Sequence, residues 1–214
     1  MRKERIDGQK TREAILVAAT EVFAEKGFEG TSTRDICARA GVNNALVNRY
    51  YGTKDNLYRI VAKSLFGDLG APLARLADGV DSQESWQNAI RTWIDDFLYM
   101  TLPQATAQKR CSILFREEIT HPTRFIQEFR NDFGRPIFHA LKRLFAMALA
   151  DENEILLWTS SVWAQVSAYA LVDPIWHEDF RPKGMSNADW ASQIRDHICA
   201  QIFRALSYRK GKGR

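Results

Sequence analysis

The chain has 214 residues, of which 45% are hydrophobic and 26% are charged, and its formal net charge is +4 at pH 7. This composition is ordinary for a globular protein and argues against wholesale disorder. The three cysteines form no CxxC pair, which argues against a disulfide scaffold and a thiolate metal site and favours a reducing, cytoplasmic location.

The charges are distributed unevenly along the chain. Residues 1–54 hold ten Lys and Arg against seven Asp and Glu, whereas residues 55–203 hold fifteen against nineteen. A basic head on an acidic body is typical of a head that meets a polyanion, but a chance fluctuation in surface charge gives the same pattern. The charge pattern alone therefore decides nothing, and a motif is needed.

Helical spacing dominates the chain, and no segment shows the alternation that is typical of a strand. We expect a first helix to be capped by Thr11 and to end at Gly27, because glycine accepts the left-handed backbone of a helix end. Its apolar stripe comprises Ile15, Ala18, Ala19, Val22 and Phe23. A second helix is expected from Ser32 or Thr33 to Gly41, a short third one after Asn43, and a fourth from Lys54.

The remaining residues predict longer amphipathic helices. One stripe runs from Trp86 to Phe97 and ends before Pro103, and a further helix is expected at about 105–119. The stripe from Phe125 to Ala148 contains Pro136, which predicts a kink or break near Gly134. A helix near 153–172, a loop at 173–186 and a last helix at 187–208 complete the chain.

Residues 155–172 form an uncharged stretch of about eighteen residues, which is the threshold length for a membrane span. Several hydroxyl and amide side chains interrupt it, and the chain has no second stretch of this kind. A helix that is apolar on all sides can equally be buried in protein on all sides. We therefore expect a buried helix rather than a membrane span.

The most informative stretch is 31–54, TSTRDICARAGVNNALVNRYYGTK. It predicts two helices of about two turns each, joined by a tight turn at Gly41, with Asn43 capping the second helix. Helices this short need a packing base, which the first and fourth helices can supply. A short helix with a polar leading face, held by such a turn, has the geometry that enters the major groove of DNA.

This stretch strongly resembles the DNA-binding domain of the TetR family of regulators. The resemblance covers about 50 residues and rests on a series of small motifs in the right order. They are Gly27-Phe28, Thr31-Ser32-Thr33, Arg34-Asp35-Ile36-Cys37, Ala40-Gly41-Val42, Asn43, Tyr50-Tyr51 and Lys54-Asp55-Asn56-Leu57. Ala45 and Asn48 stand where the family commonly has a glycine and an aromatic residue. Both lie on the expected recognition helix, so the operator sequence of this protein cannot be inferred from the operators of its relatives.

The resemblance implies roles that the residue chemistry also supports. Hydroxyl and cationic groups suit phosphate, whereas Asn pairs well with adenine and Arg with guanine. The expected phosphate contacts are Thr31, Thr33, Tyr50 and Lys54. The residues expected to reach bases or nearby phosphates are Arg34, Asn43, Asn44, Leu46, Asn48 and Arg49. For any single one of them, a solvated or capping role is the alternative.

For the rest of the chain the resemblance implies a helical domain that binds a small ligand and dimerises through its last two helices. Residues 114–125 are similar to the C-terminal domain of CecR-type members of the family. We expect an all-α protein of about nine helices, with a three-helix DNA-binding head at 1–53 and an effector and dimerisation domain at 54–214. Ile198 is expected to face the symmetry mate.

Aromatic residues of the body could line an apolar ligand pocket, with Arg116 at its polar end. The candidates for this pocket are Trp93, Phe97, Phe115, Arg116, Phe133, Trp158 and Trp163. For each aromatic residue alone, ordinary core packing is the stronger interpretation. The four histidines fit no metal-binding spacing, and no catalytic motif is present, so we expect no metal, no cofactor and no catalytic residue.

Taken together, the sequence predicts a ligand-responsive regulator, most simply a repressor, that is not an enzyme. As a homodimer it would bind a palindromic DNA operator and be released by a small apolar or aromatic effector. Two alternatives stay open: an all-helical enzyme with a regulatory DNA-binding head, and a nucleoid-type DNA-binding protein without an effector. A large aromatic-lined cavity would exclude the second alternative.

Overall fold

The computed structural model describes residues 2–101, 106–171, 179 and 181–208, which contain helices and no strand. The expected all-α fold is confirmed. The helices are α1 (Arg2–Lys26), α2 (Thr33–Ala40), α3 (Asn44–Tyr51), α4 (Lys54–Arg75), α5 (Gln83–Thr101), α6 (Thr106–Thr120), α7 (Ile126–Phe129), a π-helical turn η1 (Arg130–Gly134), α8 (Arg135–Ala146), α9 (Glu152–Leu171) and α11 (Asn187–Ala205). With α7, η1 and α8 counted as one continuous helix, the described residues hold nine helices.

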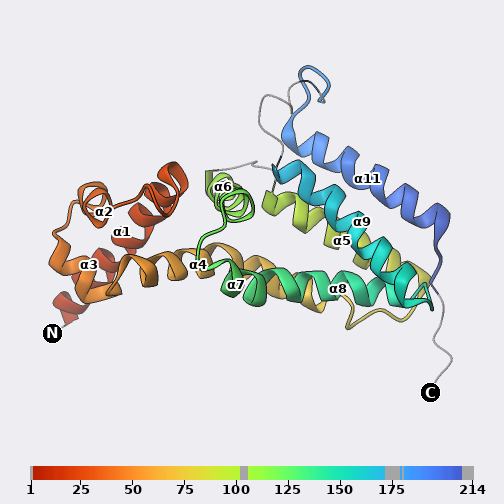
Figure 1. Cartoon of the computed structure of the whole chain (residues 1–214), viewed down its shortest axis with the longest axis horizontal. Helices are drawn as coiled ribbons and strands as arrows, with labels where there is room; N and C mark the ends of the chain where they lie inside the picture. The colour runs from red at the N-terminus through yellow and green to blue at the C-terminus, as the bar shows by residue number, and fades with distance from the viewer. Residues whose placement is uncertain (1, 102–105, 172–178, 180, 209–214) are drawn as a thin grey trace.

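The helices α1, α2 and α3 gather at one end of the molecule, and the remaining helices form a longer body (Figure 1). Helix α4 begins beside α3 and runs along the body, where it contacts α5, α6 and α8 as well as α1. Helix α11 lies on the outer side of the body and packs against α5. Because α4 contacts both parts, the domain boundary expected between residues 53 and 54 stays a prediction.

Capping groups define the short helices of the head. Ser32 accepts a hydrogen bond from the Asp35 backbone N–H, and the Asp35 carboxylate accepts one from the Ser32 N–H, which together form a capping box at the start of α2. Helix α2 ends at Gly41, whose φ of 66° is in the left-handed region. Asn43 caps α3 through a hydrogen bond from the Leu46 N–H. The predicted boundaries of both helices are therefore confirmed.

The start of α1 differs from the prediction. The helix begins at Arg2, not at Thr11, so Thr11 lies inside it and does not cap it. The residues before Thr11 are mostly strong helix formers such as Arg, Lys, Glu and Gln, and none of them is a proline. Because nothing in this segment terminates a helix, α1 continues for several turns beyond the expected cap.

Pro136 interrupts the long helix of the body, as the sequence predicts, but the chain does not break there. Arg130–Gly134 forms a π-helical turn, and α8 begins at Arg135 with Pro136 in its first turn. A proline has no N–H and its ring displaces the carbonyl four residues earlier, so an ordinary α-helical turn cannot pass through it. The wider π turn absorbs this mismatch and keeps α7 and α8 continuous.

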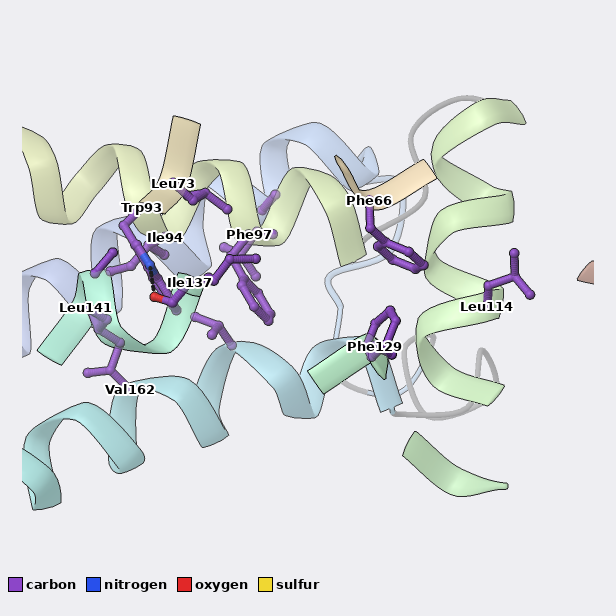
Figure 2. Packing of buried hydrophobic residues seen from close by; sticks show 14 of the residues in the cluster. Phe66, Leu73, Trp93, Ile94, Phe97, Leu114, Phe129, Ile137, Leu141 and Val162 are labelled. Carbon is purple, nitrogen blue, oxygen red and sulfur yellow. Dashed lines mark hydrogen bonds between the residues drawn. The ribbon is translucent and has the colours of Figure 1, made fainter. Parts of the chain in front are cut away.

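The core of the body lies between α5, α8 and α9, and the apolar stripe predicted for α5 is fully buried. Trp93 donates its indole N–H to the Ile137 carbonyl at 3.2 Å, a hydrogen bond that Figure 2 shows between α5 and α8. Trp86 makes the equivalent bond to the Leu144 carbonyl at 2.7 Å. Each indole thus buries its ring without leaving its polar atom unsatisfied.

The uncharged stretch in α9 is part of this packed body. Val162 and Val166 are almost fully buried against α5 and α8, whereas Leu157 is 71% exposed. None of the helices that the structure describes combines the length and the apolar composition that a bilayer span requires.

Phe97 is expected to be a main determinant of stability, because it is fully buried and contacts Trp93 and Trp163 with ring centroids 5.2 Å away in each case. Phe97→Ala should lower the free energy of unfolding by about 3–5 kcal/mol, measured by urea denaturation. Tyr99→Ala, a control at an exposed position of the same helix, should change it by less than about 0.5 kcal/mol. Equal effects of the two substitutions would contradict this packing.

Candidate nucleic-acid interface

Helix α3 presents one polar stripe to solvent. Asn44, Ala45, Asn48 and Arg49 are exposed, whereas Val47 faces inward and is 1% exposed. The exposed positions repeat at the spacing of one helical turn, so they share one face. The head therefore displays the leading face that the sequence predicts for a recognition helix.

Ion pairs fix α2 against α1 and leave other cations unpaired. Arg39 binds the carboxylates of Glu21 and Glu25 on α1, and Lys26 binds Asp35 at 2.6 Å. The hydrogen bond from Lys26, together with those from Ser32, holds the pKa of Asp35 well below its usual range. The bonds to Glu25 and Glu21 raise the pKa of Arg39.

Arg34 and Arg49 differ from Arg39 and Lys26 in their ion pairing. Both are exposed, and neither takes part in an ion pair within the described residues. The Arg49 guanidinium lies 5.8 Å from the centre of the Tyr50 ring, which guides its direction without neutralising its charge. These two side chains are therefore free to meet phosphates or bases.

Most of the predicted DNA-contacting residues lie on this surface of α2 and α3. Arg34, Asn43, Asn44, Asn48 and Arg49 are exposed, and Thr33, Leu46 and Tyr50 are half-buried. The side-chain oxygen of Asn43 is occupied by the cap of α3, which leaves its NH₂ group for a ligand. The structure thus brings eight of the ten predicted residues to one region, and whether they touch DNA stays a prediction.

Thr31 and Lys54 differ from the other predicted contacts, because both bind backbone carbonyls near the loop between α1 and α2. Thr31 is 2% exposed, and its hydroxyl donates to the Gly27 carbonyl at 2.7 Å, so its side chain offers no exposed donor to a phosphate. Lys54 donates to the carbonyls of Phe28 and Thr31, each at 2.9 Å, and its ammonium lies 4.2 Å from the centre of the Phe28 ring. Both residues hold the loop between α1 and α2. Burial removes the Thr31 side chain from the expected phosphate contacts. Lys54 is half-buried and keeps a third N–H donor, so its phosphate contact stays a prediction.

The sequence missed one neighbour of α3, the N-terminal part of α1. A methyl group added at Gly8 would lie 3.2 Å from the Tyr50 hydroxyl, and the Tyr51 hydroxyl donates to the Arg12 carbonyl at 2.7 Å. The start expected at Thr11 hid this contact. The residues before Thr11 include no proline and mostly favour a helix, with Gly8 as the exception, and this is the signal that could have revealed it.

A cavity of about 220 Å³ lies where α4, α6, α7 and η1 meet. Among the described residues, seven aromatic or aliphatic and five charged ones line it: Tyr58, Arg59, Ala62, Lys63, Phe66, Leu114, Glu118, Phe125, Glu128, Phe129, Asp132 and Phe133. Figure 2 shows the rings of Phe66 and Phe129 turned toward each other, beside Leu114 on α6. A concave apolar site with a few polar groups is typical of a small-molecule site.

This cavity differs from the predicted pocket, because Phe133 is the one predicted residue with a described side chain that lines it. Trp93 and Phe97 are fully buried and stacked on each other, and Trp163 and Trp158 pack against this aromatic core and against Phe145. These four residues fill space in the body core, which is the alternative that the sequence left open.

Arg116 is half-buried on α6 outside the cavity lining. Phe115 lies on the same helix, but its side chain is outside the described residues. The spacing of Phe125, Phe129 and Phe133, one turn apart, was the sequence signal for the cavity wall. The matching ring of Phe66 comes from α4, and only the fold brings it there.

The cavity wall also contacts the head. The Tyr58 hydroxyl donates to the buried Glu118 carboxylate at 2.5 Å, and burial together with this bond raises the pKa of Tyr58. The Tyr58 ring packs against Phe23 and Phe28 of the head and against Phe125 of the cavity wall, with centroids 4.9–5.5 Å apart. One aromatic cluster thus joins the cavity to the base of α2.

Residues 15–61 match the family model described as "Bacterial regulatory proteins, tetR family". The chain is 52% identical over 63 residues to an HTH-type transcriptional repressor of Mycobacterium tuberculosis, a match that covers 29% of this chain and only 31% of that relative's length. It is 31% identical over 200 residues to the HTH-type transcriptional regulator BetI 1 of Chromohalobacter salexigens, which covers 92% of this chain and 93% of that protein.

The similarity expected to CecR-type regulators is also found. The HTH-type transcriptional dual regulator CecR of Shigella flexneri is 27% identical over 176 residues, which cover 78% of each chain. Among solved structures, NalD of Pseudomonas aeruginosa, the secondary repressor of the MexAB-OprM multidrug efflux pump, superposes with a TM-score of 0.65 at 25% identity. That superposition covers 96% of this chain and all of NalD.

The structural role of Lys54 gives a testable prediction. Lys54→Met keeps the apolar stem but removes the ammonium, so two backbone carbonyls lose a charged donor, and the free energy of unfolding should fall by about 1–2 kcal/mol. Lys63→Met, at an exposed position of the same helix, should change it by less than about 0.5 kcal/mol. Chemical denaturation measures both, and an unchanged stability of Lys54→Met would refute the role.

Proposed function

The chain belongs to the tetR family of bacterial regulatory proteins, and from this membership we propose that it is a sequence-specific, ligand-responsive transcriptional repressor. It acts as a homodimer on a palindromic operator, in the cytoplasm where bacterial DNA lies. The observation that carries the proposal is the exposed stripe of α3, with Asn44, Asn48 and Arg49 on one face. No ion pair among the described residues involves Arg34 or Arg49, which leaves both for DNA.

Each polar group of this stripe has a chemically suitable partner in a major groove. Asn44 and Asn48 carry the amide that binds the N6 and N7 atoms of adenine, and Arg49 carries the fork that fits guanine or a phosphate. Thr33 and Tyr50 stand at the edges of the stripe with hydroxyls that suit phosphate. Helix α3 is capped by Asn43, buries Val47 and Tyr51, and is bonded to α1 through the Tyr51 hydroxyl, so little conformational entropy is lost when it docks.

We place the dimer contact on the outer face of α9 together with α11. On α9, Leu156 and Leu157 are 38% and 71% exposed, and the positions one and two turns further along hold the small residues Ser160 and Ala164. Small side chains let a second helix approach closely, and two exposed leucines give apolar area to bury. Ile198 does not belong to this face, because it is 2% exposed within the single chain.

The cavity supports regulation by a small molecule. Its wall and the base of the head share Tyr58 and Phe125, so a ligand that displaces either residue changes the packing on Phe28. Linkage then works in both directions: a ligand that prefers the conformation with misplaced heads weakens DNA binding, and DNA weakens ligand binding equally. The aromatic-lined cavity also disfavours the effector-independent nucleoid protein. Membership in a family of regulators argues against the enzyme.

DNA binding is tested with two substitutions on α3. Arg49→Ala should weaken binding to all duplexes by about 1–3 kcal/mol. The salt slope, which is the dependence of the logarithm of the binding constant on the logarithm of the salt concentration, should become shallower by about 1, as for the loss of one phosphate contact. Asn48→Ala should instead change the preference among operator variants. Fluorescence anisotropy across a salt series, on a near-palindromic duplex with half-sites roughly one helical turn apart, measures both effects.

Arg39→Ala is the matched control, because Arg39 is an exposed arginine of the head whose charge is already neutralised by Glu21 and Glu25. Its salt slope should equal that of the wild type. Equal affinity of the wild type for random and selected duplexes would contradict sequence-specific recognition.

The dimer surface is tested with Leu157→Asp. Burying this charge against a second copy is unfavourable, so the dimer dissociation constant should rise at least about tenfold and operator affinity should fall with it. Val17→Asp, a 53% exposed apolar position in the head, should stay dimeric. Light scattering coupled to gel filtration measures the molar mass of both variants. A Leu157→Asp protein that is as dimeric as the wild type would place the interface elsewhere.

A further inference from the structure

We infer that the ligand of the cavity is an organic cation, a protonated amine on an apolar or aromatic body, and that the Glu118 carboxylate receives its charge. The inference rests on the proposed function in so far as the cavity is the effector site.

Glu118 is a buried carboxylate with spare acceptor capacity. It is 2% exposed and lines the cavity from α6. Its Oε1 accepts hydrogen bonds from the Tyr58 hydroxyl at 2.5 Å and from the Thr123 hydroxyl at 2.8 Å. Its Oε2 accepts only a long bond of 3.4 Å, from the Thr123 backbone N–H. A carboxylate oxygen accepts two hydrogen bonds, so Oε2 is left with room for a strong donor.

Within the part of the chain that the structure describes, no cation pairs with this charge. None of the ion pairs among the described residues includes Glu118. Arg59 also lines the cavity, but it is bound to Glu128 through two hydrogen bonds of 2.7 and 3.0 Å. A buried charge without a partner is unfavourable, and a cation brought by the ligand would relieve that cost.

The walls suit the body of such a ligand. The ring centroids of Phe66 and Phe129 lie 4.9 Å apart, and that of Phe133 lies within 5.7 Å of both, so three aromatic rings in mutual contact form part of the wall of the cavity that Glu118 also lines. Aromatic faces attract cations and bury apolar groups, and an N–H donor on the ammonium could reach Oε2. The cavity therefore offers aromatic rings to the apolar body of an amine and the Glu118 carboxylate to its ammonium group.

An anionic ligand with an apolar tail would instead use Lys63, which is, besides Arg59, the other cation among the described lining residues. Lys63 is exposed, so its charge is already solvated, whereas the Glu118 charge is not. An anion would also have to place its negative charge or its tail beside a buried carboxylate. These differences favour the cation.

The experiment compares three probes with the same body: 4-phenylbutylamine, 4-phenylbutanol and 4-phenylbutyrate. Calorimetric titration into the full chain without DNA should give the amine an affinity at least about tenfold above the alcohol, as for a charge-assisted hydrogen bond. The butyrate should bind most weakly. Glu118→Gln should bring the amine down to the affinity of the alcohol and leave the alcohol unchanged.

Glu117→Gln is the matched control, because Glu117 is the adjacent carboxylate and lies outside the cavity lining. It should keep the preference of the wild type. Far-ultraviolet circular dichroism checks that Glu118→Gln is folded, and if it is not, the ranking of the probes by the wild type decides alone. A folded wild type that binds the butyrate best, binds all three alike or binds none would overturn the inference.

A Glu118→Gln protein that keeps the amine preference would overturn it too. Because DNA is absent from these titrations, their outcome is independent of operator binding. A chain that selects the amine but fails to bind any duplex would retain the inferred ligand chemistry and lose the proposed function.

Discussion

The hydrogen bond from Tyr58 to Glu118 joins α4 to α6 at the place where the body meets the head, and the contacts between head and body are built around it. It places a carboxylate of α6 against α4, in a site that is almost closed to water. Thr123 binds the same carboxylate, so the turn that leads into α7 is fixed as well. Loss of a hydrogen bond to a buried carboxylate is costly, so the donors to Oε1, on α4 and on this turn, are strongly held in place.

Further contacts extend this junction to the head. Phe28 lies between Tyr58, Phe125 and the Lys54 ammonium, which binds the carbonyls of the loop after α1. Arg110 of α6 pairs with Glu21 of α1 at 2.5 Å. The head is thus tied to the body by packed rings and ion pairs. A change at the cavity reaches α2 and α3 through direct contacts, because close-packed side chains transmit displacement.

The described cations of the head fall into those that form ion pairs and those that do not. Arg39 and Lys26 are neutralised by carboxylates that hold α2 on α1, whereas Arg34 and Arg49 take part in no ion pair of the described residues. Paired and unpaired arginines look alike in a charge count. The modest positive balance of the head therefore understates how much positive charge α2 and α3 present to a polyanion.

The sequence by itself determined the local features. Caps at Ser32 and Asn43, the left-handed turn at Gly41 and the helix interruption at Pro136 are read from neighbouring residues, because each depends on the chemistry of a few consecutive positions. Only the tertiary structure decided which aromatic residues pack and which line a cavity. Phe66 meets Phe129 and Glu118 meets Tyr58 across long stretches of chain, and periodicity shows that a side chain faces inward without showing what it meets there.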